Sequence, residues 1–384
     1  MLKFNYIYQV PLFVVGLMFA TGSQAGLVPP GGIYQPPDSL NPGCEVTGRS
    51  MPAFKDFIRP GWQEAPQTLQ KLLITSDSQG FRYKSGSEEK FSKWQWTSIT
   101  DRMATILRSE REGAQYVPLI INGDITEFGH SDERAAFRRF VQQTLSKNAG
   151  GPLFLPGLGN HDYSNNVNDC ANNGCARDAV CDHIGWTKTI QENAQNFSFD
   201  HAFKNDTHTG SLSYSFDIGK LHIVQLNNEP TYTRSFETGG VAKGFKRRFH
   251  ITSAMSWLEQ DLKEARLRGK ITIINMHKPS DWQQDAVRSG KFKQLIEDNN
   301  VVGLFAGHYH RRLGKVNYAA FGKVPMYSSG AIMYDNYLRV TFDWNASSMR
   351  VEWFEGRALK GSHTQAFITP PPITNKPLPI PLAK

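Results

Sequence analysis

Short apolar runs alternate with helical patterns in the first half of the chain, and this alternation predicts the fold class. The runs Leu72–Ile74 and Val117–Ile121 are each followed by a segment whose apolar residues recur at helical spacing, Trp96–Leu107 and Phe137–Leu145. Short apolar strands separated by amphipathic helices are typical of an α/β protein in which both sheet faces are covered. We therefore expect an α/β sandwich.

The second half continues this pattern and then changes to strands alone. A hairpin is predicted over Ser211–Leu226, and a helix is predicted from Thr252 or Ser253 to Gly269. Glycine is a common residue at the end of a helix, which supports that boundary. Further strands are predicted at Ile271–Asn275, Val301–Ala306, Val324–Ser328, Tyr337–Phe342 and Met349–Phe354.

The N-terminal segment has the pattern of a secretory signal. Lys3 supplies a positive start, Val10–Ala20 is an apolar run, and small residues precede Ala25. The run is shorter than the roughly 18 to 20 apolar residues that a membrane span needs. We therefore expect a secreted or periplasmic protein, cut near Ala25, rather than one with an uncleaved anchor, and no membrane span.

These patterns divide the chain into five parts. We predict a signal peptide at 1–25, a Pro/Gly-rich N-terminal extension at 26–68, a main domain at 69–343 with a Cys-containing insert at 163–210, a C-terminal strand region at 344–368, and a Pro-rich tail at 369–384.

Composition and cysteine usage narrow the possible functions. An apolar content of 39% excludes disorder over most of the length. A net charge of +8 without a long Lys/Arg block gives no reason to expect a specific nucleic-acid partner. In an exported protein without a C-x-x-C pair, the four cysteines favour disulfides over a zinc site. We expect one bridge within the insert (Cys170, Cys175, Cys181) and one that ties Cys44 to the body; all three pairings stay open.

Polar residues that can bind metals follow five of the apolar runs. In chain order the runs lead to Asp77 and Gln79, to Asp124, to Asn160, His161 and Asp162, to His277, and to His308 and His310. Because ligands in open α/β sheets bind at the carboxyl ends of the strands, these side chains are expected to converge. Oxygen and imidazole donors together suit a transition metal, and a shared carboxylate can bridge two ions.

The short sequence motifs that contain these residues, and their order, resemble a known motif series. The words GDxxE at 123–127, GNHD at 159–162 and GHxH at 307–310 resemble those of the calcineurin-like metallophosphoesterase superfamily. A word such as GNHD arises by chance only about once in 10⁵ to 10⁶ positions. The resemblance covers roughly Leu69 to Phe342 and implies a four-layer α/β/β/α sandwich with two metal ions at one sheet edge.

The resemblance also implies a ligand set. It assigns one ion to Asp77, Gln79, Asp124 and His310, and the other to Asp124, Asn160, His277 and His308. The departure is Gln79, because the family usually has His there, although some members are similar in having D-x-Q. A carboxamide oxygen favours Mn, Fe or Mg at that site, in a divalent or mixed-valence pair, with Zn still possible. The alternative is that Gln79 faces water.

The mechanism that the resemblance implies is an in-line attack on phosphorus by a hydroxide that bridges the metals. His161 is the expected general acid, and Asp162 is expected to orient it. Three more residues are candidates for metal support or substrate contact, namely Glu127, His130 and Arg311. The alternatives are a first-turn helix carboxylate for Glu127 and a solvated side chain for Arg311.

The sequence therefore predicts an exported dinuclear-metal phosphoesterase whose substrate is a phosphate ester. Monoester and diester substrates stay open, because both use the same kind of metal centre. One alternative is a nuclease or a nucleotide or phospholipid phosphodiesterase; a nuclease would show base contacts and strong salt dependence. Another is a non-catalytic binding protein on the same fold. The intact His161–Asp162 pair argues against a binding protein, which needs no proton donor.

Overall fold

The computed structural model describes residues 44, 62–64, 68–79, 82–85, 88–91, 101, 117–140, 154–239, 246–280, 282 and 290–368. The predicted signal peptide, the Pro-rich tail, nearly all of the N-terminal extension and the helix predicted over Trp96–Leu107, apart from Asp101, lie outside these residues. The predicted domain boundaries therefore stay predictions.

A six-stranded sheet forms one side of the core, with strand order β19-β18-β17-β1-β4-β5. Strands β1, β4 and β5 run parallel, whereas β17 joins β1 in antiparallel register. The strands are β1 (Leu69–Thr75), β4 (Leu119–Ile121), β5 (Phe154–Pro156), β17 (Asn336–Asp343), β18 (Ser348–Glu355) and β19 (Ala358–Ala366).

A seven-stranded sheet forms the other side, with strand order β15-β16-β14-β13-β10-β9-β6. Its middle strands β10, β13, β14 and β16 are parallel. The strands are β6 (Ser198–Phe199), β9 (Tyr214–Ile218), β10 (Leu221–Gln225), β13 (Ile271–Met276), β14 (Val301–Ala306), β15 (Leu313–Val316) and β16 (Met326–Ser329). Strands β9 and β10 confirm the predicted hairpin.

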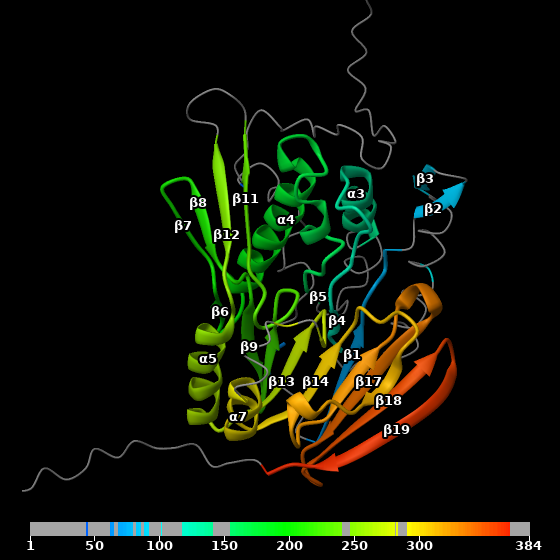
Figure 1. The fold of residues 1–384 in the computed structure, drawn as a ribbon. Coiled ribbons are helices and arrows are strands. Elements are labelled where there is room, and N and C mark those ends of the chain that lie inside the picture. The colour runs from blue at the N-terminus through cyan, green and yellow to red at the C-terminus, as the bar shows by residue number, and fades with distance from the viewer. Residues whose placement is uncertain are drawn as a thin grey trace, which may run out of the picture.

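Apolar side chains from the two sheets share one core. Ile74 and Val340 of the six-stranded sheet cluster with Ile273 and Phe305 of the seven-stranded sheet. A second cluster joins the other face of the seven-stranded sheet to helices α5 (Met255–Leu267) and α7 (Lys291–Asp298), which lie over it in Figure 1. The fold is α/β as predicted, and the four-layer arrangement stays a prediction.

The remaining elements lie outside these two sheets (Figure 1). They are α3 (Ser131–Phe140), α4 (Gly174–Gln191), a four-stranded sheet of β7 (Ala202–Lys204), β8 (Thr207–Gly210), β11 (Arg234–Thr238) and β12 (Arg247–Ile251), a hairpin of β2 (Arg82–Ser85) and β3 (Glu88–Phe91), and four 3₁₀ turns, Ser164–Asn166, Ala171–Asn173, Ala319–Phe321 and Ile332–Tyr334. None of the described helices is long and apolar enough to cross a membrane.

Two disulfides give the cysteines the roles expected from the sequence. Cys170–Cys175 closes a short loop in the insert, and Cys44–Cys181 ties the N-terminal extension to α4. The insert itself is more ordered than its polar sequence indicates, because α4 buries Val180, Ile184 and Trp186 against the body.

Candidate metal centre

The carboxyl ends of β1, β4, β5, β13 and β14 bring the predicted ligands together. Ligand atoms of Asp77, Asp124 and His310 lie within 4.8 Å of one another, and so do those of Asp124, His277 and His308. Asp124 belongs to both groups, which is the position that a bridging carboxylate would take. The topology therefore supplies two overlapping ligand sets from separate parts of the sequence.

The backbone of these motifs is unusual in two ways: three of the candidate ligands have positive φ values, and a glycine allows two motif loops to approach closely. Asp77, Asp124 and His308 have positive φ values of 53°, 50° and 69°, a conformation that costs free energy and is often retained at functional sites. A Cβ on Gly123 would lie 2.6 Å from the backbone nitrogen of Gly159. Glycine at 123 thus lets the second and third motifs approach closely enough to share one site.

His277 presents one ring nitrogen to the ligands. Its Nδ1 donates a hydrogen bond to the Asn122 carbonyl at 2.8 Å, while Nε2 lies 3.0 Å from Asp124 Oδ2 and 3.0 Å from Asn160 Oδ1. Burial lowers the pKa of His277, but the charge of Asp124 and their hydrogen bond outweigh it and raise the pKa to about 9. A positive charge is therefore favoured at this point, and a proton or a metal ion can supply it.

His308 is a suitable neutral donor in the same group. Burial, followed by repulsion from His277 and Lys278, lowers the pKa of His308 to about 4. An unprotonated imidazole is the form that binds metals.

The other candidate ligand group is made by Asp77, Asp124 and His310, and Gln79 follows Asp77 by two residues. Asp77 Oδ2 accepts a hydrogen bond from the His308 backbone N–H at 3.0 Å, and Asp77 Oδ1 lies 3.2 Å from His310 Nε2. Gln79 donates through Nε2 to Glu127 Oε2 at 2.6 Å. Gln79 is only 2% exposed, so the alternative in which it faces water does not hold in this structure.

The buried oxygens test whether these residues fit metal ions. Gln79 Oε1 is buried without a hydrogen-bond partner among the described residues, whereas the buried Asp77 Oδ1 and Asp124 Oδ2 face the imidazoles of His310 (3.2 Å) and His277 (3.0 Å). Buried polar atoms are nearly always paired, and the two buried carboxylates here need either protonated imidazoles or bound cations to balance their charge. The donor set therefore fits metal ions.

A comparison with known families agrees with this geometry. The model of the calcineurin-like phosphoesterases matches residues 70–312, which include every predicted ligand. The chain belongs to the calcineurin-like phosphoesterase family.

Solved structures with a similar fold share little sequence with this phosphoesterase. Purple acid phosphatase PPD1 from yellow lupin seeds has 14% identity and a TM-score of 0.45, with 79% of this chain and 54% of that chain covered. A dimetal phosphatase from Danio rerio has 12% identity and a TM-score of 0.49, with 79% and 100% covered. A 5′-nucleotidase from Candida albicans has 16% identity and a TM-score of 0.40, with 73% and 53% covered. This chain thus spans about half the length of the lupin and Candida proteins. A comparison with curated protein sequences gave no match.

The predicted general acid His161 lies at the edge of the centre, but its partner differs from the expectation. Both oxygens of Asp162 are occupied elsewhere, by the Thr126 backbone N–H (2.8 Å) and hydroxyl (3.0 Å) and by the Gly159 N–H (2.9 Å). His161 Nδ1 instead lies 3.1 Å from the Glu127 carbonyl and 3.4 Å from Glu127 Oε1. Asp162 therefore joins the second and third motif loops, and Glu127 holds the imidazole.

The environment of Asp162 changes its pKa strongly. Burial and then the charge of Asp124 raise the pKa of Asp162 to about 6. Asp124 behaves in the opposite way, because His277 and His161 more than offset its burial and lower its pKa to about 2. Of these two carboxyl groups, Asp124 is therefore the one that keeps its negative charge and can attract cations.

The secondary candidates Glu127 and His130 have different positions. Helix α3 begins at Ser131 and has Asp132 and Glu133 in its first turn, so the interpretation of Glu127 as a first-turn carboxylate is wrong. His130 is buried near the sulfurs of Cys170 and Cys175, which are bonded to each other and cannot bind a metal. The structure thus places Glu127, and not His130, against a predicted ligand.

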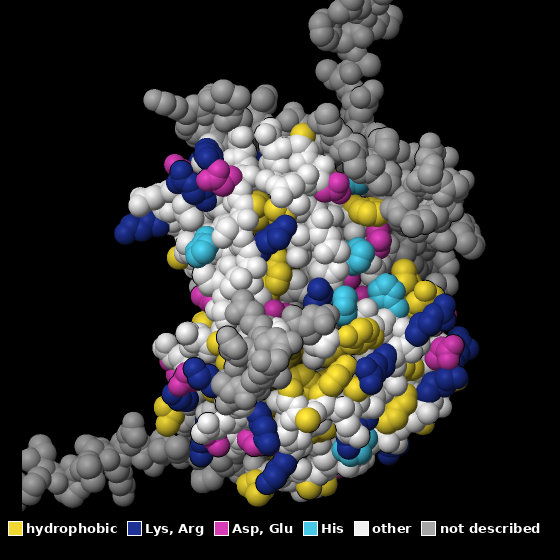
Figure 2. Space-filling view, in the orientation of Figure 1, with side chains coloured by type: hydrophobic (Ala, Val, Ile, Leu, Met, Phe, Trp, Pro, Cys, Tyr) yellow, Lys and Arg dark blue, Asp and Glu magenta, His cyan; other side chains and the backbone are white. Residues whose placement is uncertain are grey.

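Arg311 lies beside the exposed side of the centre. Its guanidinium is 4.4 Å from the centre of the Tyr334 ring, which in turn lies 6.4 Å from the His310 ring. Figure 2 shows histidines on one face of the molecule next to hydrophobic side chains and to Lys or Arg. Stacking on Tyr334 holds a cation where an anionic substrate would approach.

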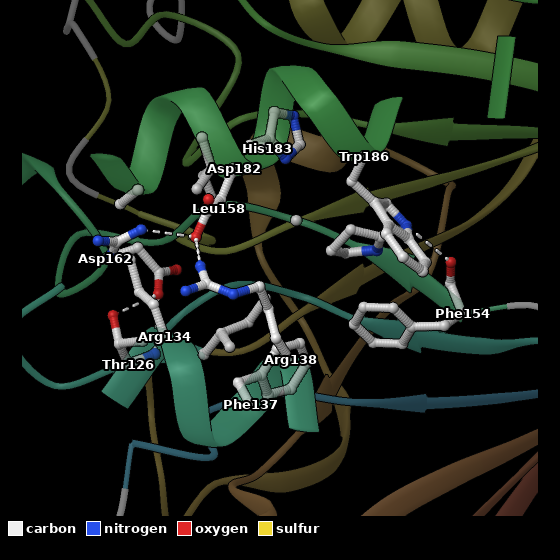
Figure 3. A pocket seen from close by; sticks show the side chains of 14 residues that line it. Thr126, Arg134, Phe137, Arg138, Phe154, Leu158, Asp162, Asp182, His183 and Trp186 are labelled. Atoms are coloured by element: carbon white, nitrogen blue, oxygen red, sulfur yellow. Dashed lines mark hydrogen bonds and ion pairs between the residues drawn. The ribbon is translucent and has the colours of Figure 1, made fainter. Parts of the chain in front are cut away.

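A separate small cavity lies behind the motif loops. Thr126, Asp162, Arg134, Phe154 and Trp186 are among its lining residues (Figure 3), and its volume is about 60 Å³. Ligand sites usually measure roughly 300 to 1,000 Å³, so this cavity has room only for water.

Proposed function

We propose that this phosphoesterase is an exported dinuclear-metal enzyme in which His161 is the general acid. The carrying observation is the pair of candidate ligand groups that share the buried Asp124, with an unpaired buried oxygen on Gln79 and a partly exposed imidazole beside them. Two bound metal ions would supply an activated water and neutralise charge on the phosphoryl oxygens. Oxygen-rich ligands favour Mn, Fe or Mg at the Gln79 site, and Zn is possible.

The residues around His161 fix the direction of its proton. Nδ1 is held by Glu127, which leaves Nε2 as the ring nitrogen that can donate to the leaving oxygen. The His161 backbone N–H donates to Asp124 Oδ1 at 2.8 Å, so the acid and the shared carboxylate form one unit. The side chain of His161 is 30% exposed, which allows a substrate to reach it.

The substrate contacts proposed from this geometry lie on the same exposed side. His310, Tyr334 and Arg311 adjoin the centre there, and the free donors of a stacked guanidinium suit phosphate oxygens. This arrangement supports a phosphate-ester substrate and favours an enzyme over a binding protein. It fits both monoesters and diesters, including nucleotide and phospholipid diesters.

Export is supported by two features that are independent of the site. The first 25 residues have the pattern of a cleavable signal, and four cysteines form two disulfides. Disulfides persist mainly in oxidising compartments such as the periplasm and the extracellular space.

The test compares wild type with His161→Ala after loading with Mn²⁺. We expect His161→Ala to lower turnover of a chromogenic ester by about 10²- to 10⁴-fold with metal content unchanged. The exposed His250→Ala is the control and should keep wild-type turnover. Assays of a phosphomonoester and its bis-ester counterpart show which class is preferred. If metal-loaded wild type hydrolyses neither ester, the proposed function is wrong.

A further inference from the structure

The side chain of Glu127 lies between a metal ligand and the general acid. Oε2 accepts the hydrogen bond from Gln79 Nε2 at 2.6 Å, and Oε1 lies 3.4 Å from His161 Nδ1. The Glu127 side chain is 22% exposed, whereas Gln79 is buried. Gln79 is also the position at which this chain departs from the usual histidine of the family.

A carboxamide differs from an imidazole or a carboxylate because its two ends are not equivalent. Only the oxygen has lone pairs for a metal, and the NH₂ group is a donor. Rotation of the amide by 180° would turn the NH₂ group toward the other ligands. Gln79 can therefore bind a cation in only one of two orientations of similar shape.

Glu127 distinguishes between these two orientations. A carboxylate only accepts hydrogen bonds, so it attracts the NH₂ end of Gln79 and repels the oxygen end. In the observed orientation the NH₂ end contacts Glu127, and the buried Oε1 has no hydrogen-bond partner among the described residues. The reverse orientation would place two acceptors against each other.

We propose that Glu127 is a positioning residue that fixes the Gln79 carboxamide with its oxygen toward the first metal and so makes Gln79 a ligand. The inference rests on the proposed dinuclear centre. It is specific to glutamine, because a neutral imidazole always has one nitrogen without a proton and can adopt the tautomer that the metal requires.

The experiment combines Glu127→Ala with Gln79→His in a double-mutant cycle. Mn²⁺ binding to each metal-free protein is measured by equilibrium dialysis, and electron paramagnetic resonance separates a coupled ion pair from single ions. We expect Glu127→Ala to weaken the first-site affinity about 10- to 100-fold, the usual range for a residue that orients a ligand. The second ion should stay bound.

The same substitution in the Gln79→His background should weaken the first site by less than about threefold, because the imidazole needs no orientation. An equal loss in both backgrounds, or no loss in either, would overturn the proposal. Glu127→Gln is the second variant, for the case that Glu127→Ala does not fold. Its neutral amide presents both a donor and an acceptor, so it should give an intermediate loss that Gln79→His again removes. A wild type that binds fewer than two Mn²⁺ ions would instead contradict the dinuclear centre itself.

Discussion

Two buried groups of carboxylates and imidazoles lie at opposite ends of the strands in the seven-stranded sheet. The metal centre is at the carboxyl ends, where His277 follows β13. The other group surrounds His222, at the amino end of β10, where its neighbour Leu221 pairs with Ile271 at the start of β13. His222 Nδ1 lies 2.7 Å from Asp217 Oδ1, and Nε2 lies 2.9 Å from Asp261 Oδ2.

The two groups contain the same residue types but differ in how their charges are paired. The other oxygens of the His222 group have donors: Asp261 accepts from Ser215 at 2.6 Å, and Asp217 accepts from Arg268 at 3.0 Å. In the candidate metal centre, Asp124 Oδ2 and Asp77 Oδ1 face the imidazoles of His277 (3.0 Å) and His310 (3.2 Å), and both histidines are themselves predicted metal ligands. The His222 group is thus completed by a hydroxyl and a guanidinium, whereas the imidazoles of the candidate metal centre can bind cations in place of protons.

The largest expected effect comes from Asp124→Asn. This change removes the charge shared by both ligand groups while keeping an oxygen for the His161 N–H. Both metals should be lost, and hydrolysis should fall about 1,000-fold or more, since electrostatic stabilisation is usually the largest catalytic contribution. Metal content by mass spectrometry and an ester assay measure the effect. Asp217→Asn is the matched control and should keep both metals; an Asp124→Asn protein that keeps two would contradict the comparison.

The second-largest expected effect is a loss of folding free energy without a change in metal content or turnover. His222→Leu leaves two carboxylates without their shared partner, and breaking a buried ion pair costs about 3 to 5 kcal/mol. Urea unfolding measures the loss, and His250→Leu, an exposed control, should stay within about 0.5 kcal/mol of wild type. Turnover and metal content at temperatures below unfolding should not change. A loss of metal from His222→Leu would show that the two groups are not independent.

The smallest effect is a pH dependence of stability. Burial lowers the pKa of His222, but Asp261 and Asp217 outweigh it and raise the pKa to about 9 from an ordinary 6.5. A raised folded-state pKa stabilises the fold fully below pH 6.5, and the contribution is lost as pH rises through 9. Its size is on the order of 3 kcal/mol. Unfolding free energies of wild type should fall by this amount more than those of His222→Leu between pH 6 and 10; equal slopes would refute the assignment.

The sequence predicted the strands well, and it named the polar side chains that the structure brings together at the strand ends, because both signals are local. Buried parallel strands are continuous apolar runs, as in Ile271–Met276, and the ligands follow these runs within a few residues. Strand β19 was missed because its residues alternate between exposed and half-buried and include little apolar surface. The sequence of helix α4 looks polar because it contains Arg177 and Asp178, which are buried. Asp178 forms ion pairs with both Arg177 and Arg134.

The partner of His161 could not be predicted from its neighbour in sequence. Consecutive residues in a loop point in different directions, and Asp162 turns toward Thr126 while His161 turns toward Glu127. The available signal was the glutamate of the GDxxE word, whose loop packs against the GNHD loop. The disulfide pairing was also open, because it depends on which cysteine of the insert the N-terminal extension reaches.

The central claim is that the strand ends, and not the similar group around His222, hold two metal ions. Anomalous X-ray diffraction from crystals grown with Mn²⁺ tests it most directly. We predict two peaks about 3.5 to 4 Å apart that share Asp124. One should lie beside Asp77, Gln79 and His310, and the other beside Asn160, His277 and His308. A single peak, no peak, or a peak at His222 would contradict the account.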